Sequence, residues 1–204
     1  MKLRLHPILV PFFLLLFISG GFALYALIFM SLLIHEAGHI VAARASGMKV
    51  RICTILPYGG ELQIPSRYLY GKKQQVMVAI GGPIATAILL FIGLIVPFPG
   101  NDQFVRIQLA ILFLNLLPIL PLDGGQALLA LLESDANKYK VRSAFLIYSI
   151  SILSVLILLL FIGWPKTVLA IALALFLLVQ NISAFKFRKY ERAYELLKRK
   201  QLTS

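Results

Sequence analysis

Two histidines stand four residues apart in an apolar stretch of the chain, in the order His35-Glu36-Ala37-Gly38-His39. If this stretch is a helix, residues four apart lie on one face about one turn from each other, so the two imidazoles can bind a single metal ion. Glu36 follows the first histidine directly, which places its carboxylate where it could take a proton from a metal-bound water. The pattern therefore predicts metal-assisted hydrolysis with Glu36 as the base.

A catalytic zinc usually has three protein ligands and leaves its fourth position for water. Asp123 is the best candidate for the third ligand, because it follows an otherwise uncharged apolar run. Its surroundings, residues 115–125, carry two prolines that interrupt a helix and two glycines that allow close backbone approach. The sequence therefore predicts one Zn²⁺ per chain, bound by His35, His39 and Asp123.

Asn115 is the lone amide in the apolar stretch before Asp123. Its side chain could hold the substrate backbone or a developing oxyanion, as asparagine does in other acyl-transfer sites. An interhelical hydrogen bond worth roughly 1 kcal/mol explains the residue equally well. Both interpretations stay open, and Asn115 is kept as a candidate catalytic residue beside Glu36.

The elements that must position these residues are hydrophobic. Of the 204 residues, 60% are apolar and 14% are charged, and the mean hydropathy is +0.89, whereas soluble domains are roughly 25% charged. The chain is therefore predicted to be a polytopic membrane protein. A carboxylate inside a membrane segment costs about 2.5–3.5 kcal/mol on insertion scales, which indicates a functional reason for Glu36.

Six hydrophobic segments predict an all-α fold with about six transmembrane helices. They cover about 5–19, 22–45, 76–97, 104–122, 144–164 and 168–184. The first segment also resembles a secretory signal peptide, but as a retained helix it gives an even number of crossings. Residues 1–184 are accordingly assigned to one intramembrane domain, and residues 185–204 to a basic cytoplasmic tail that serves as a stop-transfer anchor or binds anionic lipid headgroups.

The distribution of basic residues predicts the orientation in the bilayer. The net charge is +12, but the basic residues form no separate domain with interleaved aromatics, so nucleic-acid binding is not expected. With a cytoplasmic amino terminus, all of the 20 Lys and Arg residues except Arg106 and Lys166 fall on the cytoplasmic side, as the positive-inside rule requires. We expect a multi-pass cell-membrane protein with both termini in the cytoplasm.

One connecting segment, residues 51–65, contains two short strand-like runs around Pro57-Tyr58-Gly59-Gly60. It predicts a small β-hairpin at the membrane face, with an ordinary surface loop as the alternative. Non-helical backbone at membrane depth is tolerated only against protein or a wet cavity. The lone cysteine, Cys53, excludes an intramolecular disulfide and a Cys-rich metal cluster, and we expect it to be structural.

The chain resembles the site-2 protease family of intramembrane zinc metalloproteases, peptidase family M50, and within it the branch of stage IV sporulation protein FB. The resemblance covers most of the chain and rests on four motifs: residues 35–39, the turn at 57–60, Gly81-Gly82-Pro83 and residues 115–125. It implies a six-span enzyme with its zinc near the cytoplasmic face, ligands at His35, His39 and Asp123, and the base at Glu36.

The resemblance also implies the activity. Family members cleave transmembrane or membrane-associated proteins in regulated intramembrane proteolysis, and the sporulation branch releases a transcription factor, a pro-sigma factor, from its pro-sequence. Many relatives add a PDZ or nucleotide-sensing domain, but only about twenty residues follow the sixth segment here, so regulation through such a domain is not expected. An inhibitory membrane partner and a homo-oligomer both stay open.

Two other classes of protein are alternatives to a protease. A proteolytically inactive relative could bind membrane segments without cutting them, but a decayed site would be expected to lose Glu36 first. A metal transporter would need ligands at several depths of the bilayer, whereas the chain has three histidines in all. The protease remains the preferred interpretation, with the inactive zinc-binding relative as the alternative.

Overall fold

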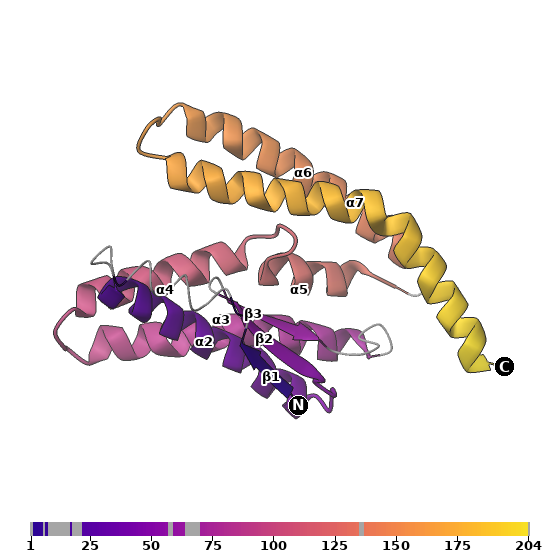
Figure 1. Ribbon diagram of the computed structural model, residues 1–204, viewed down its shortest axis with the longest axis horizontal. Helices are drawn as coiled ribbons and strands as arrows, with labels where there is room; N and C mark the ends of the chain where they lie inside the picture. The colour runs from indigo at the N-terminus through magenta and orange to yellow at the C-terminus, as the bar shows by residue number, and fades with distance from the viewer. Residues whose placement is uncertain are drawn as a thin grey trace. The chain divides into compact units, whose positions relative to one another are not determined.

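The computed structural model describes residues 2–5, 7, 17, 22–56, 59–63, 70–134 and 137–203. In chain order the elements are β1 (Lys2–Leu5), α2 (Phe22–Ala45), β2 (Ile52–Leu56), β3 (Gly59–Gln63), α3 (Lys72–Ile95), α4 (Asn101–Leu116), α5 (Asp123–Leu132), α6 (Lys138–Phe161) and α7 (Val168–Thr203), drawn in Figure 1. The chain divides into two compact units, one of residues 1–117 with 122–127 and one of residues 118–121 with 128–204.

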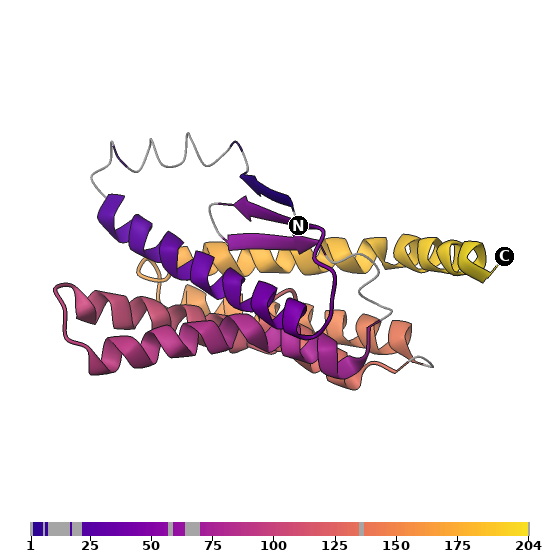
Figure 2. The same cartoon turned by 90° about the horizontal axis from the view of Figure 1, so that it is seen from below.

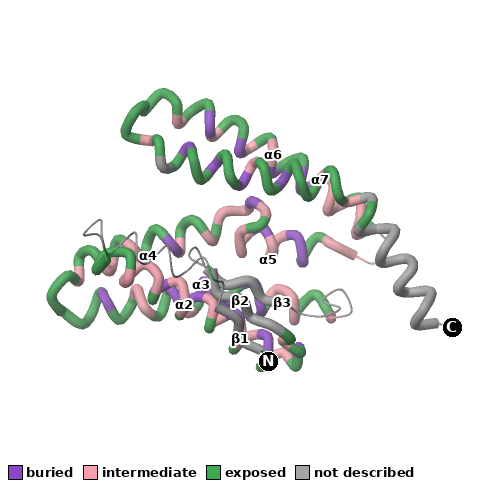
Figure 3. The backbone as a smooth tube through the Cα atoms, viewed as in Figure 1, coloured by how far each residue is buried: buried purple, intermediate pink, exposed green. Residues whose placement is uncertain are grey.

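Four of the described helices are long and apolar enough to cross a membrane, namely α2, α3, α6 and the 170–188 part of α7. Figure 3 shows their buried positions as short patches on otherwise exposed helices, and many of the exposed side chains are large and apolar. Such surfaces suit lipid rather than water. The prediction of a helical membrane protein is thus confirmed.

The predicted count of six spans is not established by the described residues. Helix α4 has 16 residues, fewer than the roughly 20 that cross a bilayer. It ends at Leu116 because Pro118 disfavours helical backbone at the residue before it, and Leu117 is extended, with φ −60° and ψ 136°. The predicted helix over 104–122 is therefore too long at its carboxyl end. The predicted segment 5–19 lies almost wholly outside the described residues, so the spans predicted over 5–19 and 104–122 both stay predictions.

A three-stranded sheet belongs to the first unit, in the order β1-β2-β3. Strand β2 pairs antiparallel with β3, and β1 pairs parallel with β2, as Figure 2 shows. The two strands β2 and β3 occupy the runs in which a hairpin was expected, but Pro57 and Tyr58 of its turn lie outside the described residues. Its position at the membrane face stays a prediction. The expected fold class lacked β1, so the all-α description is incomplete.

Glycines bring α2 and α3 into backbone contact. A Cβ on Gly81 would lie 2.6 Å from the carbonyl oxygen of Gly38 and 2.6 Å from Cβ of Ala42, and a Cβ on Gly38 would overlap the carbonyl oxygen of Gly81. Small residues at such crossings let membrane helices approach closely. The helices run antiparallel, since His35 contacts Thr86 while His39 contacts Val78.

A buried polar pair joins α2 to α4. Nε2 of Gln108 donates to Oγ of Ser31 at 2.6 Å, and this hydroxyl donates to the carbonyl of Leu27 at 2.8 Å. Both side chains are almost completely buried. Interhelical bonds of this kind are worth roughly 1 kcal/mol in membrane proteins, so the pair stabilises the first unit.

The second unit is built on the antiparallel pair α6 and α7, which lie side by side in Figure 1. Its buried apolar side chains include Leu153, Ile157, Ile171, Ala174 and Leu177. Helix α7 continues without a break past residue 184. The proposed basic tail is therefore helical in the structure, and its separation from the intramembrane domain stays a prediction.

The close crossing of α2 and α3 generates the first testable prediction. Gly38→Ala places a methyl group against the carbonyl of Gly81 and 2.7 Å from Cβ of Ala85, and overpacking of this kind costs about 1–3 kcal/mol. We expect a lower midpoint of thermal unfolding for the detergent-purified protein. The control is Gly71→Ala, whose added Cβ has Gln74 Oε1 at 3.7 Å as its nearest neighbour and should change stability by no more than about 0.5 kcal/mol. Equal midpoints for the two variants would contradict this account of the crossing.

Candidate metal centre

Helix α2 brings His35 and His39 together on one buried face, as their spacing predicts. The two residues are 3% and 6% exposed. The rings meet edge to face with centroids 4.9 Å apart, and their Nε2 atoms are 3.3 Å apart. Two nitrogen donors thus point at the same region of space.

Asp123 reaches these histidines from the start of α5. Its Oδ2 lies 2.9 Å from Nε2 of His35 and 3.2 Å from Nε2 of His39. Gly124, the next residue, allows this approach because it has no side chain. A Cβ at this position would overlap the carbonyl oxygen of Leu116 at the end of α4. The chain folds back tightly on α4 at a residue without a side chain, and the carboxylate then faces α2.

The three atoms have the spacing that a metal ion requires. A tetrahedral zinc with bonds of about 2.0–2.1 Å holds its ligand atoms roughly 3.3 Å apart, and the separations here run from 2.9 to 3.3 Å. His35, His39 and Asp123 form a possible metal-binding group in the part of the chain that the structure describes. Nitrogen and carboxylate donors in this number suit zinc with an open fourth position.

The far nitrogens of both rings are held by α3. Nδ1 of His39 lies 2.7 Å from the carbonyl oxygen of Val78, and Nδ1 of His35 lies 2.8 Å from Oγ1 of Thr86. A carbonyl can only accept, so Nδ1 of His39 carries a proton, and in the neutral form of the ring, which is the form that binds a metal, Nε2 has the free lone pair. The amide of Gly82 also lies 3.2 Å from Nδ1 of His39, but a protonated Nδ1 cannot accept a second bond, so the shorter Val78 contact prevails.

The histidines determine the charge of Asp123. Burial by itself would raise the pKa of this carboxyl, but hydrogen bonds from His35 and His39 outweigh burial and hold the pKa below its ordinary value. The side chain is therefore an anionic carboxylate at neutral pH. This is the form in which an aspartate binds a metal.

Gly82 leaves the space beside the two histidine ligands open. A Cβ there would lie 2.6 Å from Nε2 of His35 and 2.7 Å from Cε1 of His39, and it would overlap Nε2 of His39. In the sequence, Gly82 stands out only as part of the weak Gly81-Gly82-Pro83 motif, and Val78 and Thr86 belong to no motif. The available signal was their spacing, because residues 78, 82 and 86 recur every four positions and so lie along one face of α3.

The structure does not bring every predicted site residue into this group. Glu36 is half-buried on α2, next to His35 in the chain. Asn115 is half-buried on α4, and its Nδ2 donates to the carbonyl of Ile111 in its own helix at 3.0 Å. The described contact of Asn115 is thus within one helix rather than between helices, and the catalytic roles of Glu36 and Asn115 stay predictions.

Comparisons with known proteins agree with this geometry. The profile of peptidase family M50 matches residues 23–100. The chain is 27% identical to stage IV sporulation protein FB of Bacillus subtilis, over 98% of this chain and 71% of that protein. It is 37% identical to a putative zinc metalloprotease of Synechocystis, over 50% of this chain and 29% of the relative. It is 30% identical to a zinc metalloprotease of Methanocaldococcus jannaschii, over 57% of this chain and 36% of the relative.

A solved structure is similar over most of the chain. The site-2 protease from Methanocaldococcus jannaschii superposes with a TM-score of 0.67 at 25% identity, covering 90% of each chain. The fold is thus similar to that of an intramembrane protease, and the site brings together a ligand group that suits zinc. A peptidase family M50 domain matches residues 23–100, and the similarity to a solved site-2 protease extends over most of the chain, which confirms the resemblance seen in its motifs.

The open space at Gly82 predicts how metal binding can be blocked. Gly82→Ala would place a methyl group against both Nε2 atoms, so we expect the purified variant to contain little zinc by elemental mass spectrometry. The control is Gly93→Ala on the same helix, where the added Cβ would lie 2.8 Å from Phe104 but about 16 Å along α3 from Gly82. It should lose stability and retain zinc. Full zinc content in Gly82→Ala would show that the metal is bound elsewhere.

Proposed function

We propose that this chain is a zinc-dependent intramembrane endopeptidase in which His35, His39 and Asp123 bind one zinc ion and Glu36 acts as the general base. The observation that carries the proposal is the convergence of two Nε2 atoms and one carboxylate oxygen within 2.9–3.3 Å. The peptidase family M50 match and the similarity to zinc metalloproteases support it.

The metal ligands and Glu36 have separate roles in the proposed reaction. A bound zinc would supply a Lewis acid that polarises the scissile carbonyl and lowers the pKa of water to about 7. Glu36 takes the proton of the attacking water and returns it to the leaving amine. Two neutral histidines and one anionic carboxylate leave a net charge near +1 at the centre, which preserves its Lewis acidity.

The sheet offers a way to hold the substrate. Strand β3 is at one end of the strand order and packs against α2, the helix that carries both histidines. A substrate segment that leaves its helix exposes backbone groups that lipid cannot satisfy. Pairing with the outer edge of β3 by strand addition would satisfy them and would hold an extended peptide close to α2.

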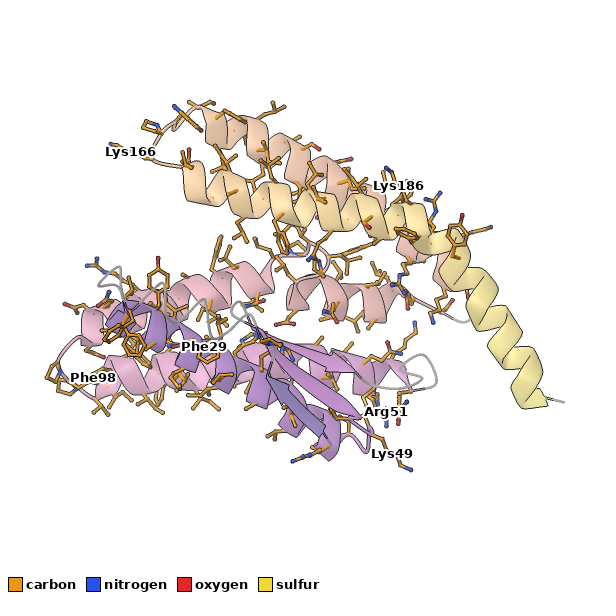
Figure 4. All side chains as sticks on the ribbon, viewed as in Figure 1. Phe29, Lys49, Arg51, Phe98, Lys166 and Lys186 are labelled. Carbon is orange, nitrogen blue, oxygen red and sulfur yellow. The ribbon has the colours of Figure 1, made fainter. Side chains whose placement is uncertain are left out.

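Charged residues support a metal centre near the cytoplasmic face. Lys49 and Arg51 follow the end of α2, whereas Phe98 lies in the turn at the far end of α3 (Figure 4). The positive-inside rule places the Lys49 end in the cytoplasm. His39 is six residues before the end of α2 at Ala45, which is about 9 Å along the helix. Both termini are proposed to be cytoplasmic, with residues 1–184 as the intramembrane domain and 185–204 as the basic tail.

The substrate is proposed to be a transmembrane or membrane-associated protein. The likeness to stage IV sporulation protein FB over nearly the whole chain supports a narrower form, the removal of a pro-sequence from a sporulation sigma factor. Asn115 is proposed to hold the substrate backbone. To do so, its side-chain amide would release the carbonyl of Ile111 and donate to a carbonyl of the substrate instead. A zinc-binding relative that binds membrane segments without cutting them is the alternative.

The role of Glu36 is tested by exchanging its carboxylate for an amide. Glu36→Gln should keep one zinc per chain and lose cleavage of a membrane-tethered pro-sigma substrate by a factor of about 10²–10⁴, since general-base catalysis contributes on that order. The control is Asp102→Asn, an exposed acid at the start of α4, which should cleave like the parent protein. Zinc and cleavage would be measured on the same preparation. Substantial cleavage by Glu36→Gln would rule out this residue as the base.

A further inference from the structure

Thr86 is a completely buried polar residue in the middle of an apolar helix, with 0% of its surface exposed. A threonine hydroxyl in a helix commonly bonds to a carbonyl of its own preceding turn. Here Oγ1 instead has a partner on another helix, Nδ1 of His35, at 2.8 Å. The hydroxyl thus contacts one ring nitrogen of His35, while the other ring nitrogen points at Asp123.

The two histidines are held by different kinds of partner. His39 is fixed by the main-chain carbonyl of Val78, which every residue type at position 78 would supply. His35 is fixed by a side chain, so its partner depends on the identity of residue 86. The backbone of α3 therefore fixes the orientation of His39, whereas the orientation of His35 depends on the side chain at position 86.

The bond also determines which nitrogen can bind a metal. A neutral imidazole carries one proton, and only the nitrogen without it has a lone pair for the ion. When the protonated Nδ1 of a neutral His35 ring donates a hydrogen bond to Oγ1 of Thr86, Nε2 is left free to bind. Without this acceptor the proton could reside on Nε2, where it would have to be displaced before the metal binds.

We propose that Thr86 is a positioning residue that holds His35 in the tautomer and ring orientation required for zinc binding. This inference rests on the proposed function, because it assigns a partner to one of the three ligands. Partners of this kind, when removed, typically lower metal affinity 10–100-fold.

Three variants separate this role from simple packing. Thr86→Val keeps the shape of the side chain and removes the hydroxyl, and Thr86→Ser restores a hydroxyl on a smaller side chain. The matched control is Ser31→Ala, which removes an equally buried hydroxyl from α2 that bonds to Gln108 and Leu27 rather than to a ligand. Each variant would be made in the full chain and purified in detergent.

The measurement is zinc affinity, by competition with a chromophoric chelator, with the visible spectrum of the Co²⁺-loaded protein as a second readout of ligand geometry. Thr86→Val should bind zinc about 10–100-fold more weakly and show an altered Co²⁺ spectrum. Thr86→Ser and Ser31→Ala should both stay close to the parent protein. If Thr86→Val does not fold, Thr86→Ala gives the same comparison.

Each outcome has a distinct meaning. Unchanged affinity and spectrum in Thr86→Val, or an equal loss in Ser31→Ala, would overturn the role of Thr86 while leaving the zinc site intact. Absence of zinc binding by the parent protein would instead overturn the proposed function itself. Recovery in Thr86→Ser together with normal binding by Ser31→Ala would support the assignment.

Discussion

The site depends on the backbone contact between α2 and α3. Lipid provides no hydrophobic driving force between helices, so they associate through close packing and polar contacts. At Gly38 and Gly81 neither helix carries a side chain between the two backbones. Because the helices lie this close, a main-chain carbonyl of α3 reaches His39, a hydroxyl reaches His35, and Gly82 leaves space for the atoms that face Asp123. A wider crossing would lose all three features together.

A break in the helical backbone, rather than a close helix crossing, positions Asp123. Prolines end α4, and the backbone released there must find hydrogen-bond partners, since lipid offers none. In the second unit, Oγ of Ser149 accepts from the amide of Leu120, and Nδ2 of Asn181 donates to the carbonyl of the same residue. Ser149 and Asn181 are both buried polar residues on membrane-spanning helices. They stabilise the turn that precedes the third ligand.

Local patterns predicted much of the fold and of the metal group. Helix α2 has the predicted bounds, and the His35 and His39 spacing maps directly onto one helical turn. Asp123 could be chosen because charge is rare in apolar segments. Strand β1 was missed because four residues near the amino terminus acquire their conformation by pairing with residues 52–55, far along the chain. The contacts of Val78, Gly82 and Thr86 depend on the register between two helices, which no single segment encodes.

The central claim is that His35, His39 and Asp123 bind one zinc ion. The most direct test is the metal content of the detergent-purified protein by elemental mass spectrometry, for the parent chain, His35→Ala, Asp123→Ala and the exposed control Asp102→Ala. The account predicts about one zinc per chain in the parent and the control, and a sharp loss in the other two variants. No zinc above background in a metal-replete parent protein, or full zinc in Asp123→Ala, would contradict it.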